Sequence, residues 1–205
     1  MTNKLNIKYY FDMAAANWDK LCHHDINKLK LIAYIADIKP NDSVIDIACG
    51  TGVLTEYILE YNPSKLLGID ISDRMIDIAK SKYTDSRVEF LASDIFDVKY
   101  DNFDLAIIYS AYPHFLDKEQ LVTKLYNILT TNGRFLIAHS ESKEAINSIH
   151  SKAFDVENIS TKLSPIEKEK VPFIESFDID IMIDTNDLYI LSGTKKTEKH
   201  ETEGD

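Results

Sequence analysis

Residues 44–58 read VIDIACGTGVLTEYI, and this stretch decides how the rest of the sequence is interpreted. Apolar and β-branched residues alternate with Asp46 and run into a small-residue cluster, after which helical spacing begins at Val53. Ala48, Gly50 and Gly52 keep side-chain bulk away from the backbone, and glycine permits the turn angles that a strand-to-helix connection needs. The stretch therefore predicts a strand, a bare turn that a ligand can approach closely, and a helix.

The composition is that of one folded domain. The chain has 205 residues, 44% of them hydrophobic, and a formal net charge of -11. This charge disfavours nucleic-acid binding, because it repels phosphate backbones. Cys22 and Cys49 are too few for a disulfide framework, which favours a reducing compartment. Neither a signal peptide nor a stretch of membrane-spanning length is recognisable, so we expect a cytoplasmic protein without a membrane partner. The sequence leaves the oligomeric state open.

Short β-rich runs alternate with helical patterns through the first two thirds of the chain, as in βαβ units. We expect strands at residues 43–48, 65–70, 87–92, 103–110 and 134–140, and helices near residues 53–60, 72–82 and 118–130. Ser72 or Asp73 is expected to cap the second helix, and Asn132-Gly133 to end the third before the next strand.

The last third of the chain has a different pattern. Phe177, Ile179, Ile181 and Ile183 alternate with polar residues, and a short turn leads back into LYILSG. Two strands joined by such a turn must be antiparallel, so we expect the sheet to end in a hairpin.

We expect a single domain over residues 1–194, with residues 1–40 as an N-terminal helical cap. The polar segment at 151–172, broken by two prolines, is interpreted as a lid over the ligand site or as a plain surface connection. The charged residues 195–205 are expected to form a disordered tail.

The glycine turn fits some cofactors better than others. A dinucleotide fingerprint needs a third small residue where Thr55 stands, and no Lys-Ser or Lys-Thr pair follows the glycines as in a phosphate-binding loop. The remaining candidate is a nucleoside that carries an amino-acid group, whose ammonium Asp46 could meet directly or through water.

At this point the sequence resembles the class I S-adenosylmethionine-dependent methyltransferases, whose first motif is D/E-x-G/A-x-G-x-G. The stretches GIDIS, LASDIFD, FDLAIIYSAYPHF and LTTNGRFLIAHS resemble their later motifs, and YYFDMAAANWD resembles the N-terminal segment of the ubiquinone and menaquinone biosynthesis enzymes. The resemblance implies a Rossmann-like, doubly wound α/β fold with a seven-stranded sheet, mostly parallel with a C-terminal antiparallel hairpin and helices on both faces.

The same resemblance implies S-adenosylmethionine as the cofactor. It places Asp70 at the ribose hydroxyls and Asp94 with Ile95 at the adenine, while Trp18 and the aromatic residues before it, including Tyr10, would cover the cofactor. The full expected set is Asp46, Ala48, Cys49, Gly50, Gly52, Asp70, Ile71, Asp94, Ile95, Tyr109, Tyr10 and Trp18. Ala48 replaces a glycine found in many members, and we expect this to cost little unless its φ is positive.

Candidates for catalysis follow the fourth and fifth strands. They are His139, Tyr112, His114 and His150. Each could also serve only in packing, and for His139 and His150 metal ligation is a further alternative. The chain lacks the Asn/Asp-Pro-Pro-aromatic motif of enzymes that methylate amino groups of nucleic acids or protein glutamine. The run Cys22-His23-His24 is interpreted as a connection before a helix starting at Asp25, and no metal site is predicted.

The sequence therefore predicts methyl transfer from S-adenosylmethionine to a small-molecule acceptor. The alternative is a non-catalytic module that binds S-adenosylmethionine or S-adenosylhomocysteine. A dinucleotide-dependent oxidoreductase is disfavoured by Thr55 and by the final hairpin.

Overall fold

The computed structural model describes residues 3–152 and 159–197, with side chains omitted at 150–152. Its centre is a seven-stranded sheet in the order β3-β2-β1-β4-β5-β7-β6. The strands are β1 (Ser43–Ile47), β2 (Lys65–Asp70), β3 (Val88–Ala92), β4 (Phe103–Tyr109), β5 (Leu129–His139), β6 (Phe177–Asp184) and β7 (Tyr189–Lys195). Neighbours from β3 to β5 are parallel, whereas β7 is antiparallel to both β5 and β6.

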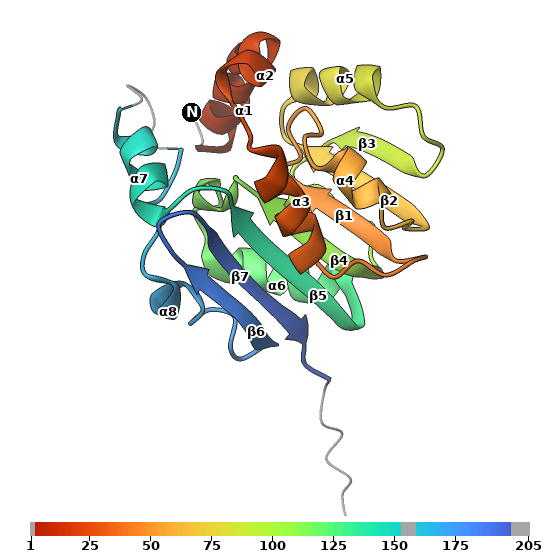
Figure 1. Cartoon of the computed structure of the whole chain (residues 1–205), viewed down its shortest axis with the longest axis vertical. Coiled ribbons are helices and arrows are strands. Elements are labelled where there is room, and N and C mark those ends of the chain that lie inside the picture. The colour runs from red at the N-terminus through yellow and green to blue at the C-terminus, as the bar shows by residue number, and fades with distance from the viewer. Residues whose placement is uncertain (1–2, 153–158, 198–205) are drawn as a thin grey trace, which may run out of the picture.

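Helices cover both faces of this sheet (Figure 1). They are α1 (Asn3–Ala14), α2 (Trp18–Leu21), α3 (Ile26–Ile35), α4 (Thr55–Leu59), α5 (Asp73–Lys82), α6 (Lys118–Ile128), α7 (Lys143–Lys152) and α8 (Ile166–Glu169). Short 3-10 turns occur at Ala15–Asn17 (η1), Ile95–Asp97 (η2) and Tyr112–His114 (η3). One large apolar cluster joins α6 and α8 to the sheet, and a second joins α3 and α4 to the opposite face.

The strand order places a ligand site at one edge. The chain passes from β1 outward to β2 and β3, then crosses back to place β4 on the other side of β1. Loops after β1 and β4 consequently leave the sheet in opposite directions and open a crevice at the carboxyl ends of these strands. In Figure 1, α1 and α2 lie above this edge of the sheet.

The predicted fold class and the final hairpin are confirmed. Ser72 is the cap of α5, because its side chain accepts the backbone N–H of Met75. Asp73 is therefore the first residue of that helix and not its cap.

The expected boundary between α6 and β5 is wrong. The helix ends at Ile128, and β5 already begins at Leu129, which pairs with Phe103. A register shift between Phe103 and Leu105 accommodates the residues around Asn132-Gly133 within the strand. Asn132 has a positive φ of 64°, so the pair forms an irregularity inside β5 instead of a connection before it.

The alternation in β6 also needs a correction. A regular strand would place Phe177, Ile179, Ile181 and Ile183 on one face. The register shifts between Ile179 and Ile181, and the two halves consequently pack on different faces of the sheet. The first pair joins the cluster of α6, whereas the second packs against the cluster of α3 and α4.

The predicted lid at 151–172 lies partly outside the described residues. From residue 159 onward the segment packs on the sheet, with Ile159, Leu163 and Ile166 buried. None of its described residues lines the cavity at the strand ends, so closure over the site stays a prediction. The predicted tail falls mostly on residues outside the described ranges.

Candidate functional site

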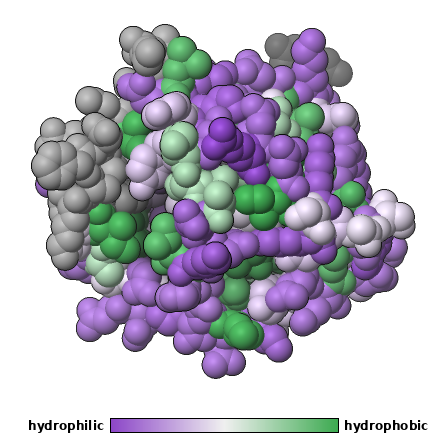
Figure 2. Space-filling view, turned by 90° about the horizontal axis from the view of Figure 1, so that it is seen from above, coloured by the Kyte–Doolittle hydropathy of each residue, from purple (hydrophilic) through white to green (hydrophobic). Residues whose placement is uncertain are grey.

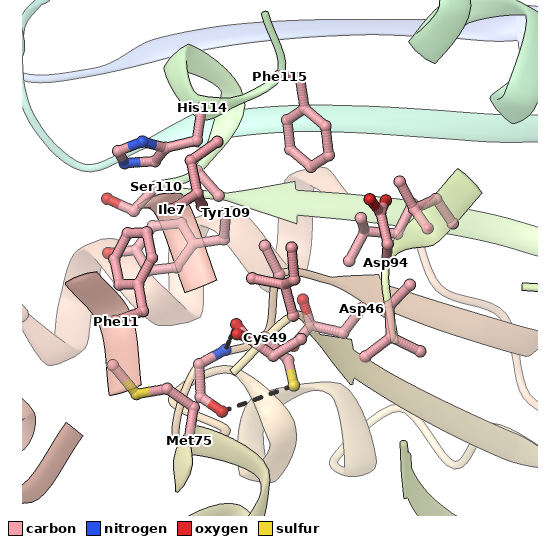
Figure 3. Close-up of a pocket in the computed structure, with 18 of the residues that line it drawn as sticks. Ile7, Phe11, Asp46, Cys49, Met75, Asp94, Tyr109, Ser110, His114 and Phe115 are labelled. Carbon is pink, nitrogen blue, oxygen red and sulfur yellow. Dashed lines mark hydrogen bonds between the residues drawn. The ribbon is translucent and has the colours of Figure 1, made fainter. Parts of the chain in front are cut away.

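A cavity of about 620 Å³ lies at the carboxyl edge of the sheet, beneath the N-terminal helices. Figure 3 shows Tyr109, Ser110 and His114 together on one side of it, with Asp94 across from them. Viewed from above, hydrophobic and hydrophilic side chains are interspersed on this end of the molecule (Figure 2). The predicted residues that line the cavity are Trp18, Asp46, Ala48, Cys49, Gly50, Asp70, Ile71, Asp94, Ile95, Tyr109, His114 and His139.

The turn after β1 is built from three residues with positive φ. The angles are 57° at Ala48, 55° at Gly50 and 84° at Gly52. A Cβ at Gly50 would meet only Trp18 Nε1, at 3.9 Å, so this backbone faces open cavity. A Cβ at Gly52 would lie 2.9 Å from the Tyr83 ring, so this glycine is required for packing and does not line the cavity.

Ala48 is strained, because its φ lies in the left-handed region that side chains disfavour by roughly 1–2 kcal/mol. The condition under which alanine was expected to be harmless is therefore not met. Glycine would remove this strain, but its more flexible unfolded chain would lower the free energy of unfolding by about 0.5–1 kcal/mol. We expect Ala48→Gly to stabilise the fold by about 0.5–1 kcal/mol in urea unfolding.

The control for this prediction is Ala33→Gly, inside α3, where φ is not positive. That change should destabilise the protein by about 1 kcal/mol or more. A similar loss in Ala48→Gly would show that the left-handed backbone at Ala48 stores no strain.

Asp70 ends β2 and is 8% exposed. Its carboxylate accepts the N–H of Gly50 at 2.9 Å and the N–H of Ser72 at 2.8 Å. Burial raises the pKa of Asp70 to about 6, an effect that these two hydrogen bonds oppose. Asp70 thus links the glycine turn to the loop after β2 and carries a carboxylate at the cavity wall.

Asp46 lies in β1 and is 2% exposed. Its Oδ1 has no hydrogen-bond partner among the described residues. Burial, with a further contribution from Asp70, raises the pKa of Asp46 to about 8. A buried carboxyl oxygen without a partner suits a ligand that brings a cation or a donor to it.

The N-terminal cap is tied to the loops that follow β1, β2 and β3. Lys4 pairs with Asp94 at 2.9 Å, and Asp12 accepts the Ser72 hydroxyl at 2.6 Å. Asp19 accepts the Thr51 hydroxyl at 2.5 Å. Each of these three loops is therefore held by at least one polar side chain of the cap.

We expect these ties to slow the release of a bound nucleoside. Asp12→Ala removes the hydrogen bond to Ser72, and it should accelerate dissociation of S-adenosylhomocysteine by about three- to tenfold. Trp18 is the single tryptophan of the chain and lines the cavity, so stopped-flow fluorescence can follow the release. Lys39→Ala is the control, because Lys39 pairs with Asp37 away from the cavity. Equal dissociation rates in both variants would show that the hydrogen bond between Asp12 and Ser72 does not slow release.

The predicted catalytic residues differ in their positions. His114 Nδ1 donates to the Ile159 carbonyl at 2.9 Å, and its ring packs edge-on against Phe11, at 5.1 Å between centroids. His139 lines the cavity but is only 1% exposed. Both histidines are therefore brought to the β4 and β5 side of the cavity.

Besides Gly52, three predicted site residues are not placed at the cavity wall. Tyr112 is fully buried, its hydroxyl donates to Glu169 at 3.0 Å, and the Lys118 ammonium lies over its ring. These contacts make the side chain of Tyr112, the first residue of η3, part of the core. Tyr10 is not among the lining residues either, and the side chain of His150 lies outside the described residues.

Several lining residues were not predicted as site residues. The most informative are Phe115 and His24, which the sequence interpretation assigned to a connection. Phe115 is the last residue of the stretch FDLAIIYSAYPHF and could have been included with Tyr112 and His114. His24 gave no local signal, because its contact with Tyr109 spans 85 positions along the chain.

The sheet order and the cavity at its switch point define a Rossmann-like α/β domain. The family described as "Methyltransferase domain" matches residues 38–199, and the chain belongs to this family. The recognition made from the sequence motifs is thereby confirmed.

Individual relatives agree with this assignment. The chain is 29% identical over 147 residues to malonyl-[acyl-carrier protein] O-methyltransferase of Priestia megaterium, a match covering 67% of this chain and 52% of that one. It is 27% identical over 142 residues to demethylmenaquinone methyltransferase of Chlamydia caviae, covering 64% and 60% respectively. The chain spans about half the length of the malonyl-[acyl-carrier protein] O-methyltransferases that it matches.

A solved structure shares the fold. Magnesium protoporphyrin IX methyltransferase from Synechocystis PCC 6803, determined with bound S-adenosylhomocysteine, superposes with a TM-score of 0.72. The superposition covers 95% of this chain and 100% of that one at 16% sequence identity.

The described residues contain neither a membrane-spanning helix nor a group of metal-ligating side chains. No helix in the described ranges is both long and apolar enough to cross a membrane. Nor do the described side chains include three or more His, Cys, Asp or Glu residues grouped to hold a metal ion.

Proposed function

We propose that this protein transfers the methyl group of S-adenosylmethionine to a small-molecule acceptor. The observation that carries the proposal is the convergence of Asp46, Asp70 and Asp94, from three adjacent strand ends, on one cavity beside the bare backbone of Gly50. Membership of the methyltransferase family and the S-adenosylhomocysteine bound in a structural neighbour support this reading.

The residues fit the cofactor chemically. Its ammonium suits the unpartnered Asp46 carboxyl, and its ribose hydroxyls suit Asp70. When bound, S-adenosylmethionine supplies a methyl carbon already activated by a sulfonium, so the protein's task is to orient the acceptor, exclude water and accept a proton where the acceptor carries one.

The charge of the cavity argues for a neutral or cationic acceptor. Lys4 is the one lysine or arginine among the described lining residues, and it is paired with Asp94 and Asp97. Five acidic residues line the same cavity: Asp46, Asp70, Asp94, Asp117 and Glu141. The described lining thus offers an anionic acceptor no unpaired lysine or arginine, and the remaining positive charges in the cavity would be those of the bound cofactor.

The test is transfer of label from methyl-tritiated S-adenosylmethionine into the dialysable small-molecule fraction of a bacterial extract. We expect label in small molecules with the wild type and much less with Asp70→Ala at the same cofactor concentration. Label in macromolecules alone would contradict the proposed acceptor class. Cofactor binding without any transfer would favour the non-catalytic binding module.

A further inference from the structure

A chain of three hydrogen-bonded side chains starts at the cavity wall and ends at the carboxyl ends of β4 and β5. His24 Nδ1 lies 2.8 Å from the Tyr109 hydroxyl oxygen, which in turn lies 2.8 Å from Ser140 Oγ. Tyr109 is the last residue of β4, and Ser140 directly follows β5. Tyr109 and Ser140 are buried, whereas His24 lies in the cavity wall. The chain therefore runs from the cavity into the sheet.

The position of His24 is fixed from two sides. Asp25 caps α3 by accepting the N–H groups of Asn27 and Lys28. The Lys28 ammonium then donates to the Ser140 carbonyl at 2.8 Å and to the Asp187 carbonyl at 3.1 Å. Docking of α3 onto the strand ends thus holds the imidazole against Tyr109.

The hydrogen-bond chain can select one imidazole tautomer. Burial raises the pKa of Tyr109 to about 12, so its hydroxyl keeps its single proton near neutral pH. If that proton is donated to Ser140, the hydroxyl oxygen accepts Nδ1–H of His24, and the lone pair of a neutral ring is then on Nε2. The described part of the chain offers no hydrogen bond to Nε2. The Nδ1–H bond would also survive protonation of the ring unchanged.

We propose that His24 accepts the proton of the methyl acceptor at Nε2, and that Tyr109 and Ser140 are positioning residues that hold the required tautomer. This inference rests on the proposed function and deepens it, because it requires an acceptor with a transferable proton. The acceptor's lone pair forms a bond to the methyl carbon, the carbon–sulfur bond breaks with its electron pair left on sulfur, and the acceptor's proton passes to Nε2. Solvent removes that proton after product release.

The charged groups around His24 are consistent with this role. Burial lowers the pKa of His24, so the ring is neutral near pH 7. Asp19, in α2, opposes this shift and stabilises the imidazolium once it forms, whereas neighbouring His23 acts in the opposite direction. The charge of Glu141, after β5, helps to raise the pKa of Tyr109, and Lys28, from α3, is bound to the Ser140 carbonyl. His114, by contrast, holds the Ile159 backbone and packs against Phe11 as part of the wall.

The first test needs no acceptor. Imidazole ¹⁵N shifts of the full-length protein saturated with S-adenosylhomocysteine report the tautomer of His24. We expect Nδ1–H in the wild type and a mixture with Nε2–H in Tyr109→Phe, which removes the hydroxyl but keeps the ring. A wild-type Nε2–H tautomer would overturn the proposal, and this result is independent of any turnover.

The second test uses the extract assay described for the proposed function. His24→Asn keeps an amide donor near Tyr109 but lacks a base, so we expect a loss of about 100-fold in kcat with unchanged S-adenosylhomocysteine affinity. The wild-type rate should reach its plateau below pH 7, whereas the variant's rate should continue to rise as the acceptor itself ionises. His23→Asn, at an exposed neighbour outside the cavity, should match the wild type.

The remaining outcomes are also decisive. A wild-type rate in His24→Asn, or loss of the pH dependence in His114→Asn with its retention in His24→Asn, would overturn the role of His24. Absence of turnover in the wild type would overturn the proposed function and, with it, the role of His24 as a base. An Nε2–H tautomer in a wild type that does turn over would overturn the inference alone.

Discussion

Replacing Asp70 by alanine is expected to weaken S-adenosylhomocysteine binding by roughly 10- to 100-fold, which corresponds to about 1–3 kcal/mol for a lost charged hydrogen-bond partner. Asp70 is almost buried at the cavity wall and joins Gly50 to Ser72 through two backbone hydrogen bonds. Its loss removes an acceptor for ligand hydroxyls and also loosens the turn that carries Gly50. Titration calorimetry on the wild type and the variant measures the difference directly.

Two controls separate these effects. Asp70→Asn keeps a side-chain oxygen for one backbone N–H but removes the charge, so it should lie between the wild type and Asp70→Ala. NADH should bind neither protein, because Thr55 replaces the third small residue of a dinucleotide turn. Tight NADH binding, or equal S-adenosylhomocysteine affinity in all three proteins, would contradict this assignment of the cavity.

Features set by neighbouring residues could be predicted from the sequence. The first strand, predicted one residue too long at its carboxyl end, the cap at the start of α5 and the final hairpin follow from periodicity, a side chain near its own helix terminus and a short connection. Their physics acts over a few residues, so one sequence carries the signal. The motif residues at the strand ends likewise reached the same cavity, because parallel strands bring their carboxyl ends together.

Features set by tertiary contacts could not be predicted in this way. Pairing of Leu129 with Phe103 extends β5 backward through Asn132-Gly133, although this pair alone favours a turn. The side chains of β6 change to the other face of the sheet after Ile179, because pairing with β7 introduces a bulge there. His24 reaches Tyr109 only after α3 has docked on the sheet, and nothing local to His24 announces this contact.

Asp46 leads to the second large effect, a proton released when the ligand binds. Its pKa is raised to about 8, so the carboxyl is mostly protonated at pH 7 in the ligand-free protein. A ligand ammonium beside it favours the carboxylate, and the proton must leave first. S-adenosylhomocysteine affinity should therefore rise with pH, by up to about tenfold per unit below pH 8. Calorimetry in buffers of different ionisation enthalpy should count nearly one proton released at pH 7.

Asp46→Asn is the matched variant, since it keeps the shape and removes the titration. Its affinity should change little between pH 6 and 8, apart from a smaller contribution of Asp70 near pH 6, and should fall about 10-fold or more below the wild type at pH 8.

The stability of the ligand-free fold should depend on pH in the opposite direction to the ligand affinity. Because the folded-state pKa of about 8 lies above the unfolded value near 3.9, the wild type loses stability as pH rises from about 4 to about 8, and this group causes no further loss above that range. Asp46→Asn should therefore melt several degrees higher than the wild type at pH 8, and by a smaller margin at pH 5. Equal proton release by both proteins would show that another group titrates.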